Sequence, residues 1–221
     1  AQGEIVREIV VRGNVNIEAS KILAAVTRTK VGEPYSEEGL QQDVNAVQDM
    51  GFFEPRVVFG IPEPIEGGLR IVVEVTEYPL VRAVEFEGNS VLSDEELGGE
   101  QGIILKPGDV FNYLTLRRGT ENIYALYREK GYDVEIAEVD APTTNRRWDG
   151  TLRVHLAEAQ IEAIELVGLE KTLPKVVRRE IRTRAGDLYS VSAIREDVRR
   201  LLNKGFFDEQ ADNLLDDLIR I

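Results

Sequence analysis

The chain has 221 residues, a net charge of −13 and no cysteine. The acidic balance argues against nucleic-acid binding, which needs clustered lysine and arginine, and the missing cysteine excludes disulfides and thiolate metal sites. No apolar run approaches the roughly 18 residues that cross a bilayer, and no secretory signal is recognisable.

Each third of the chain begins with an alternating strand that ends in glycine. Apolar side chains alternate along it, as Ile9 and Val11 do, so they fall on one face of a sheet. The first two copies continue into Gly-Asn, which is a turn signal because both residues tolerate positive φ. The three predicted strands cover residues 8–12, 84–87 and 164–167.

A short helix follows each strand, and a glycine three residues before an aromatic residue then leads into a second helix. The short helices are predicted at residues 19–27, 94–99 and 173–182. The glycine–aromatic pairs are Gly32–Tyr35, Gly108–Phe111 and Gly186–Tyr189. Ser36, Asn112 and Ser190 come next, and they are strong N-cap residues because their side chains accept from the first helical N–H groups.

The second helix of each copy ends at a glycine followed by an aromatic residue, a typical helix C-cap. These glycines are Gly51, Gly131 and Gly205. Copies one and three keep a constant offset of 154 residues across this helix, whereas the offset of copy two grows from 76 to 80 residues. Four extra residues are about one helical turn, so copy two is predicted to have a longer helix with its apolar face in phase.

A pair of strands closes each copy. The predicted strands are residues 57–59 and 69–75 in the first copy and 134–139 and 152–156 in the second. Trp148 precedes the Asp149-Gly150 turn of the second pair and is expected to pack against its own sheet. After Phe207 the third copy has a poor strand and too short a loop, so we expect its hairpin to be incomplete.

The repeat predicts an α+β protein of three tandem two-layer β-α-α-β-β modules. Each module is a three-stranded mixed sheet covered on one face by two helices, because a two-helix crossover adds the first strand to the hairpin. The module boundaries are 3–78, 79–159 and 160–221, the last with an incomplete hairpin. No Gly/Ser-rich linker separates the modules, so we expect a jointed arm of limited freedom.

This order of signals resembles the POTRA domains of the BamA-type outer-membrane protein assembly and polypeptide-translocating β-barrel family. In the first copy the resemblance rests on Gly13-Asn14, Gly32 to Tyr35, Gly51-Phe52-Phe53 and Val75-Thr76-Glu77. It covers nearly the whole chain and implies an arm on the periplasmic side of the outer membrane. The implied partners are unfolded outer-membrane proteins, accessory assembly proteins and a C-terminal β-barrel that this chain lacks.

An exposed sheet edge is where we expect a client chain to bind. Unpaired N–H and C=O groups on the edge pair with an extended segment, and this β-augmentation needs little sequence selectivity. In the family the exposed edge is usually the second strand. Here it corresponds to Arg56, Val57, Val58 and Phe59 in the first copy and to Asp133, Val134, Glu135 and Ile136 in the second. Alternatively, these edges are merely solvated or covered by a neighbouring module.

Positive charge gathers in the third copy. Residues 1–79 hold 7 basic and 13 acidic residues, residues 80–160 hold 9 and 15, and residues 161–221 hold 11 and 12. Because the family's last module lies nearest the barrel, a basic surface is expected there that faces the barrel's periplasmic turns or lipid headgroups. An ordinary solvated helix face is the alternative. The surface consists of Arg178, Arg179, Arg182, Arg195 and Arg199.

Nothing in the sequence favours an enzyme or a bound cofactor. His155 is the only histidine, and without cysteine it argues against a histidine-based triad or a transition-metal site. Paired carboxylates such as Glu37-Glu38 lie at helix starts, where they favour the helix dipole. One further function stays open, that of a structural spacer or scaffold with POTRA-like modules and no client binding.

Overall fold

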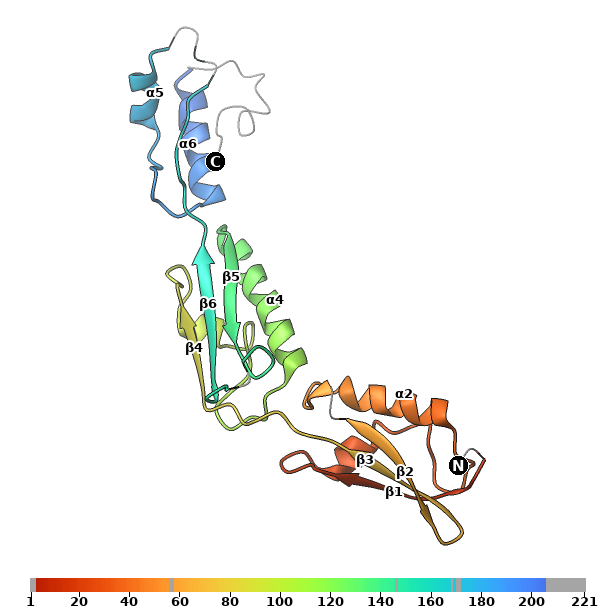
Figure 1. The fold of residues 1–221 in the computed structure, drawn as a ribbon. Coiled ribbons are helices and arrows are strands. Elements are labelled where there is room, and N and C mark those ends of the chain that lie inside the picture. Colours follow the sequence, from red (N-terminus) through yellow and green to blue (C-terminus); the bar gives the residue numbers. More distant parts are fainter. Residues whose placement is uncertain (1–2, 56–57, 146, 168, 170–171, 206–221) are drawn as a thin grey trace.

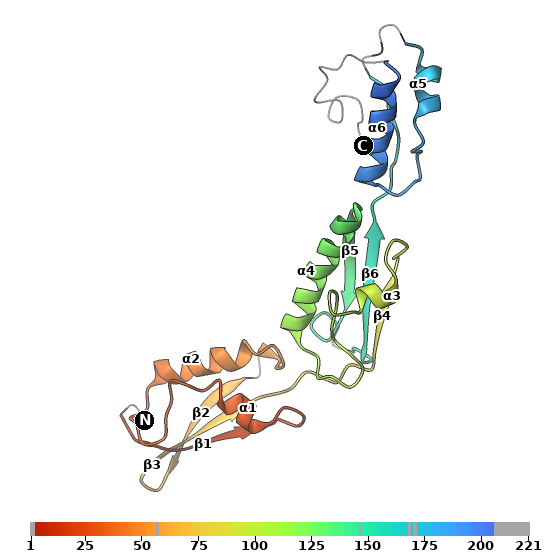
Figure 2. The same ribbon diagram turned by 180° about the vertical axis from the view of Figure 1, so that it is seen from behind.

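The computed structural model describes residues 3–55, 58–145, 147–167, 169 and 172–205. Three units follow one another along a bent, elongated arm (Figure 1). In each of the first two units a long helix lies along one face of a small sheet. The view from behind shows a short helix beside each of these sheets (Figure 2). This is the α+β layering that the repeat predicts.

The first sheet has the strand order β1-β3-β2. β1 (Val6–Arg12) runs parallel to β3 (Gly68–Glu74), and β2 (Phe59–Ile65) pairs with β3 in antiparallel register. α1 (Ala19–Leu23) and α2 (Glu37–Gln48) form the crossover between β1 and the hairpin. The core between helices and sheet includes Ile22, Leu40, Val47, Leu69, Ile71 and Val73.

The second sheet repeats this topology in the order β4-β6-β5. β4 (Ala83–Glu87) is parallel to β6 (Thr151–Glu158), and β5 (Val134–Asp140) is antiparallel to it. α3 (Asp94–Leu97) and α4 (Tyr113–Lys130) form the crossover. The core includes Leu97, Phe111, Ile123, Tyr127, Leu152 and Val154.

Trp148 packs against this second core, as predicted. Its ring lies 5.9 Å from that of Phe111 in an edge-to-face arrangement. Its indole N–H donates to the carbonyl of Thr151 (2.7 Å), so the polar end of the side chain is satisfied inside its own hairpin.

The long helices confirm the predicted caps and the extra turn. α2 has 12 residues, α6 (Val191–Asn203) has 13 and α4 has 18. The side chains of Ser36, Asn112 and Ser190 each accept from a backbone N–H in the first helical turn. The inserted turn therefore lengthens α4 without breaking the repeat.

The third unit contains α5 (Pro174–Glu180) and α6, close to the predicted helices. The structure assigns no strand to residues 161–167, where one was expected at 164–167. A first strand of this topology pairs with a central strand that follows the long helix. In the third copy that segment falls within residues 206–221, and the expected incomplete hairpin lies outside the described residues with it.

A backbone bridge ties the start of each unit to the loop before its long helix. The N–H of Gly32 donates to the carbonyl of Val6 (2.7 Å), and the N–H of Val6 donates to the carbonyl of Glu33 (3.0 Å). Gly32 has a φ of +89°, a conformation that strains other residues. The same two bonds recur through Gly108, Val81 and Asp109 and through Gly186, Ile161 and Asp187. The glycine–aromatic signal therefore marks this bridge.

In the first two modules a glutamate at or just after the closing strand holds the loop after the first strand. Glu77 accepts from the backbone N–H groups of residues 15–17, at 2.8 to 3.0 Å. Burial alone would raise the pKa of Glu77, but these donors outweigh burial and lower it. Glu158 accepts in the same way from the N–H groups of Ser90 (2.7 Å) and Val91 (2.8 Å), and its pKa is also lowered despite burial.

Glu77→Gln is expected to reduce the free energy of unfolding by about 1 to 3 kcal/mol, because the charged acceptor of several N–H groups is lost. The lowered pKa of Glu77 gives a pH dependence as well. Its stabilising contribution is complete above the unfolded-state pKa and is lost as pH falls through the lower folded-state pKa. Acidification should therefore destabilise the wild type more than Glu77→Gln.

Urea unfolding at neutral pH measures the loss of stability in Glu77→Gln. The same measurement at a pH below the ordinary pKa range of glutamate tests the pH dependence. Glu74→Gln is the matched control, because Glu74 is an exposed residue on β3, three positions earlier. Equal losses of stability in the two variants would contradict the role given to Glu77.

Candidate functional site

β2 is an outer strand of the first sheet, and the client-binding stretch predicted at residues 56–59 lies at its start. Val58 is buried with 3% of its surface exposed, whereas Phe59 begins β2 and is 50% exposed. Arg56 and Val57 lie outside the described residues. The predicted strand at 57–59 is corrected by the structure, since β2 runs on to Ile65.

Two prolines limit what this edge can donate. β2 pairs with β3 without a register shift from Phe59 to Ile65. Proline has no N–H, so it fits such a ladder only where its nitrogen faces away from the neighbouring strand. The nitrogens of Pro62 and Pro64 therefore face the free edge, which offers carbonyl acceptors there but no N–H donors.

A groove of about 640 Å³ runs between β2 and α2. Strand and helix approach closely, because a Cβ on Gly60 would lie 2.7 Å from the side chain of Leu40. The walls are mixed, because Tyr35, Leu40, Val44, Val58, Ile61 and Pro62 line the groove together with the polar side chains of Glu37, Gln41 and Gln48. Such a groove suits an apolar side chain of a bound polypeptide.

β5 is the corresponding outer strand of the second sheet. The predicted stretch Asp133–Ile136 begins one residue before the strand and covers its first three positions. It contains no proline, and its register with β6 is regular until a shift between Ile136 and Glu138. The N–H of Ile136 donates to the hydroxyl of Tyr124 on α4 (3.3 Å).

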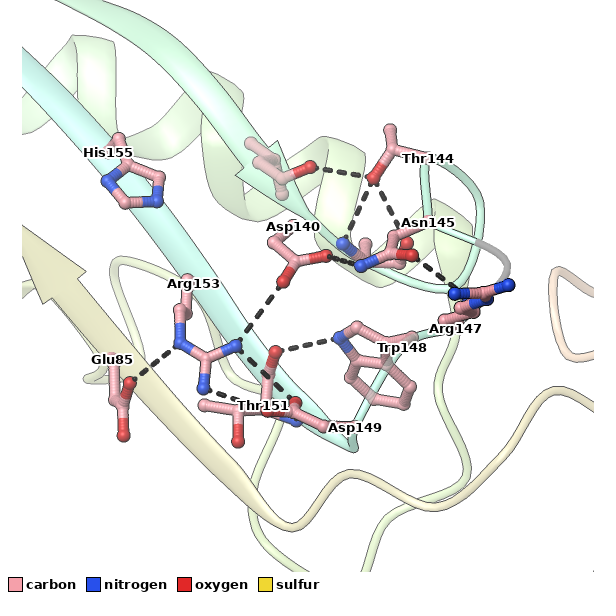
Figure 3. A network of polar contacts seen from close by, with 12 residues as sticks. Glu85, Asp140, Thr144, Asn145, Arg147, Trp148, Asp149, Thr151, Arg153 and His155 are labelled. Carbon is pink, nitrogen blue, oxygen red and sulfur yellow. Dashed lines mark hydrogen bonds and ion pairs between the residues drawn. The ribbon is translucent and has the colours of Figure 1, made fainter.

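On its open face the second sheet carries an ion-pair network around Arg153 (Figure 3). The guanidinium lies 3.2 Å from Glu85, 3.3 Å from Asp140 and 2.9 Å from Asp149. The hydrogen bond from Arg153, followed by the one from the N–H of Thr151, lowers the pKa of Asp149 to about 2. This face is therefore ordered by charge rather than by apolar packing.

His155 lies on the same strand as Arg153, farther along the sheet (Figure 3). Its Nδ1 atom is 3.1 Å from a carboxylate oxygen of Glu87. Within the part of the chain that the structure describes, no group of three or more His, Cys, Asp or Glu residues is placed to hold a metal ion. Among the same residues, no helix has the length and apolarity needed to cross a membrane.

The basic surface predicted for the third unit spans α5 and α6. Its exposed members are Arg178, Arg179, Arg182, Arg195 and Arg199. Arg179 also approaches Glu180 (3.6 Å). Arg200, from the same basic run, has a structural role instead, because its Nε donates to the carbonyl of Glu180 (3.2 Å) and its guanidinium pairs with the buried Asp197.

The family described as surface antigen variable number repeat, POTRA, matches residues 4–78, 79–157 and 159–216. The chain belongs to the POTRA family. The three matches explain why the strand-to-loop bridge recurs three times, because each POTRA repeat brings its own glycine–aromatic signal.

Two curated relatives resemble almost the whole chain. Outer membrane protein assembly factor BamA of Neorickettsia risticii (strain Illinois) is 27% identical over 95% of this chain and 30% of the relative. Outer envelope protein 80, chloroplastic, of Oryza sativa subsp. japonica is 23% identical over 93% of this chain and 32% of the relative. The chain thus spans about a third of the length of these relatives.

Solved POTRA structures share the fold. The N-terminal domain of Omp85 from Thermosynechococcus elongatus has a TM-score of 0.73 at 28% identity, covering 91% of this chain and 86% of that one. POTRA1-3 of the periplasmic domain of Omp85 from Anabaena has a TM-score of 0.65 at 20% identity, covering 95% and 88%. The second likeness concerns the fold alone.

Sequence reasoning missed Tyr124 on the second POTRA edge. Counted back from the glycine that ends each long helix, Tyr124 takes the place of Val44 and Val198. The sequence signal for this position is a tyrosine hydroxyl at a helix position where the other two repeats have valine. Its contact with Ile136 follows only from the folded arrangement of helix and strand.

Arg153→Gln is expected to raise the pKa of Asp149 from about 2 toward the ordinary value of ~3.9, because the first hydrogen-bond donor to that carboxylate is lost. An NMR titration of the Asp149 carboxyl carbon measures the change. Arg147→Gln is the control, since Arg147 lies in the same loop and its backbone N–H bonds to Asn145. An unchanged Asp149 titration in Arg153→Gln would contradict the assignment.

Proposed function

We propose that these POTRA modules, bounded at 3–78, 79–159 and 160–221, form the periplasmic polypeptide-binding arm of an outer-membrane protein assembly or translocation protein. Family membership and the BamA and Omp85 relatives support this role. The observation that carries it is that β2 and β5 each leave one side of a sheet unpaired. The proposed partners are unfolded outer-membrane proteins, accessory assembly proteins and a C-terminal β-barrel.

β-Augmentation is the proposed mode of client binding. An extended segment adds to the outer strand as a fourth strand, and its backbone supplies most of the affinity. Alternate side chains of an extended segment point to the same face, so every second residue of a client on β2 can enter the groove beside α2. Barrel strands alternate apolar and polar residues with this same period.

The edge residues proposed to contact a client are 56–59 on the first module and 133–136 on the second. On β2 the pairing is confined to the start of the strand, because Pro62 and Pro64 remove the later donors. On β5 it is confined to the stretch before the register shift at Glu138. Both modules therefore offer short edges, which suits transient binding of many clients.

A capped synthetic peptide of alternating valine, tyrosine and threonine is expected to bind the 221-residue chain. Its amide shifts in an NMR titration should concentrate at residues 58–60 and 133–136. An analogue N-methylated at every second residue should lose most of this binding, because it lacks donors on one edge while keeping the side chains. Shifts that avoid both edges, or equal binding of the two peptides, would count against augmentation and favour a spacer.

The basic surface of the third module is proposed to face the barrel's periplasmic turns or lipid headgroups. Arg178 on α5, Arg195 and Arg199 on α6, and Arg182 in the connection between the two helices are exposed. An exposed cluster of one sign attracts an anionic surface within about one Debye length, roughly 8 Å at physiological salt. The rest of the arm is acidic, so any such contact is confined to this end.

Arg178→Glu combined with Arg182→Glu is expected to weaken binding of the chain to vesicles containing phosphatidylglycerol, because the variant repels the anionic surface. Co-sedimentation at low and physiological salt measures the effect, with neutral phosphatidylcholine vesicles for comparison. Arg117→Glu with Arg118→Glu is the matched control on exposed positions of α4. Equal vesicle binding of both variants would contradict a contact with lipid headgroups and leave the barrel's periplasmic turns as the proposed contact.

A further inference from the structure

Tyr124 covers a hydrogen-bonding position on the outer edge of β5. The side chain of Ile136 packs against the core, and its N–H donates to the Tyr124 hydroxyl (3.3 Å) instead of to β6. In an antiparallel strand the N–H and C=O of one residue point to the same side. Ile136 therefore directs both groups toward the free edge, as does Val134 two residues earlier.

The same corner of the second module has a groove of about 340 Å³ between α4 and β5. It is lined by Glu121, Tyr124, Arg128, Tyr132, Asp133 and Val134. Tyr124 is 38% exposed, so its side chain is not locked into the core. Tyr124, Tyr132 and Val134 offer apolar contact to a side chain next to the strand, and the other three lining residues are charged.

Counted back from the glycine that ends each long helix, the sister modules have valine in place of Tyr124. The equivalent helix positions hold Val44 and Val198, which have no hydroxyl to offer. On β2 the donors at positions 62 and 64 are removed permanently by proline. β5 keeps its donors, and one of them is satisfied by a side chain that a partner's carbonyl can replace.

We propose that Tyr124 is a competitive cap on the edge of β5, and that an extended polypeptide pairs with Val134–Ile136 by displacing its hydroxyl. The proposal rests on the proposed client-binding function and assigns backbone pairing chiefly to the second module. The Tyr124 hydroxyl stands in for a client carbonyl, which keeps the Ile136 N–H paired while the edge is empty. A client must break this bond before making its own, so the cap lowers affinity for every client equally.

Tyr124→Phe removes the cap and keeps the ring. The Ile136 amide should then exchange with deuterium faster in the free protein. The alternating valine, tyrosine and threonine peptide should bind tighter by about two- to tenfold, the factor that one net hydrogen bond supplies. Tyr124→Val, which copies the residue of the sister modules, should have the same direction of effect.

Tyr113→Phe is the matched control. It removes another exposed tyrosine hydroxyl from α4, about three turns from Tyr124. Its Ile136 exchange and peptide affinity should equal those of the wild type. Thermal unfolding of all variants checks that the fold is retained.

The outcomes separate the cap from the proposed function. Faster Ile136 exchange with unchanged peptide affinity in Tyr124→Phe would overturn the competition and leave client binding standing. Absence of peptide binding to the wild type and to Tyr124→Phe alike would overturn both. Faster exchange together with tighter binding, lost again with the N-methylated peptide, would support the cap.

Discussion

The architecture of each module depends on the backbone bridge between its start and the loop before its long helix. The bridge satisfies hydrogen-bonding groups at Val6, Val81 and Ile161, and the helix N-cap follows within five residues of the glycine. One motif therefore fixes where the helix begins relative to the sheet. The bridge reaches the start of β1 and the chain leading into β4, on the side of each sheet opposite β2 and β5.

The same long helices join successive modules. The carbonyl of Gly51 accepts from the N–H of Tyr113 at the start of α4 (3.0 Å), and the carbonyl of Gly131 accepts from the N–H of Val191 at the start of α6 (3.1 Å). The first N–H groups of a helix have no partner within the helix. Here the carbonyl that follows one long helix accepts from the first N–H of the next long helix. The same backbone hydrogen bond therefore recurs at both module boundaries, where the sequence has no Gly/Ser-rich linker.

Signals that act over a few residues could be predicted, whereas contacts between distant segments could not. Caps, glycines and the extra turn of α4 were found from spacing alone. By contrast, Asp43 accepts from the N–H groups of residues 27–29 (2.7 to 2.9 Å), a bond that periodicity does not reveal. Counted forward from the glycine before each long helix, Gly119 takes this place in α4, where a Cβ would lie 2.7 Å from Ile103. The candidate site also depends on contacts between distant segments. Pro62 argues against a strand in the sequence, and it fits β2 only because β2 is an outer strand of the sheet.

Repetition lets the outer strands differ while the modules stay alike. Bridge, cap and core hold each module without help from the outer side of β2 or β5, so substitutions on that side cost little stability. Under the proposed function, proline on the first edge and Tyr124 on the second both reduce the number of unpaired donors that can recruit a second chain indiscriminately, which is the hazard of any open edge. Proline removes the donor permanently, whereas the Tyr124 hydroxyl occupies a donor through a single hydrogen bond that can be broken. Under the proposed function, an arm built this way resists aggregation when empty and still yields to a client whose whole strand outweighs a single hydrogen bond.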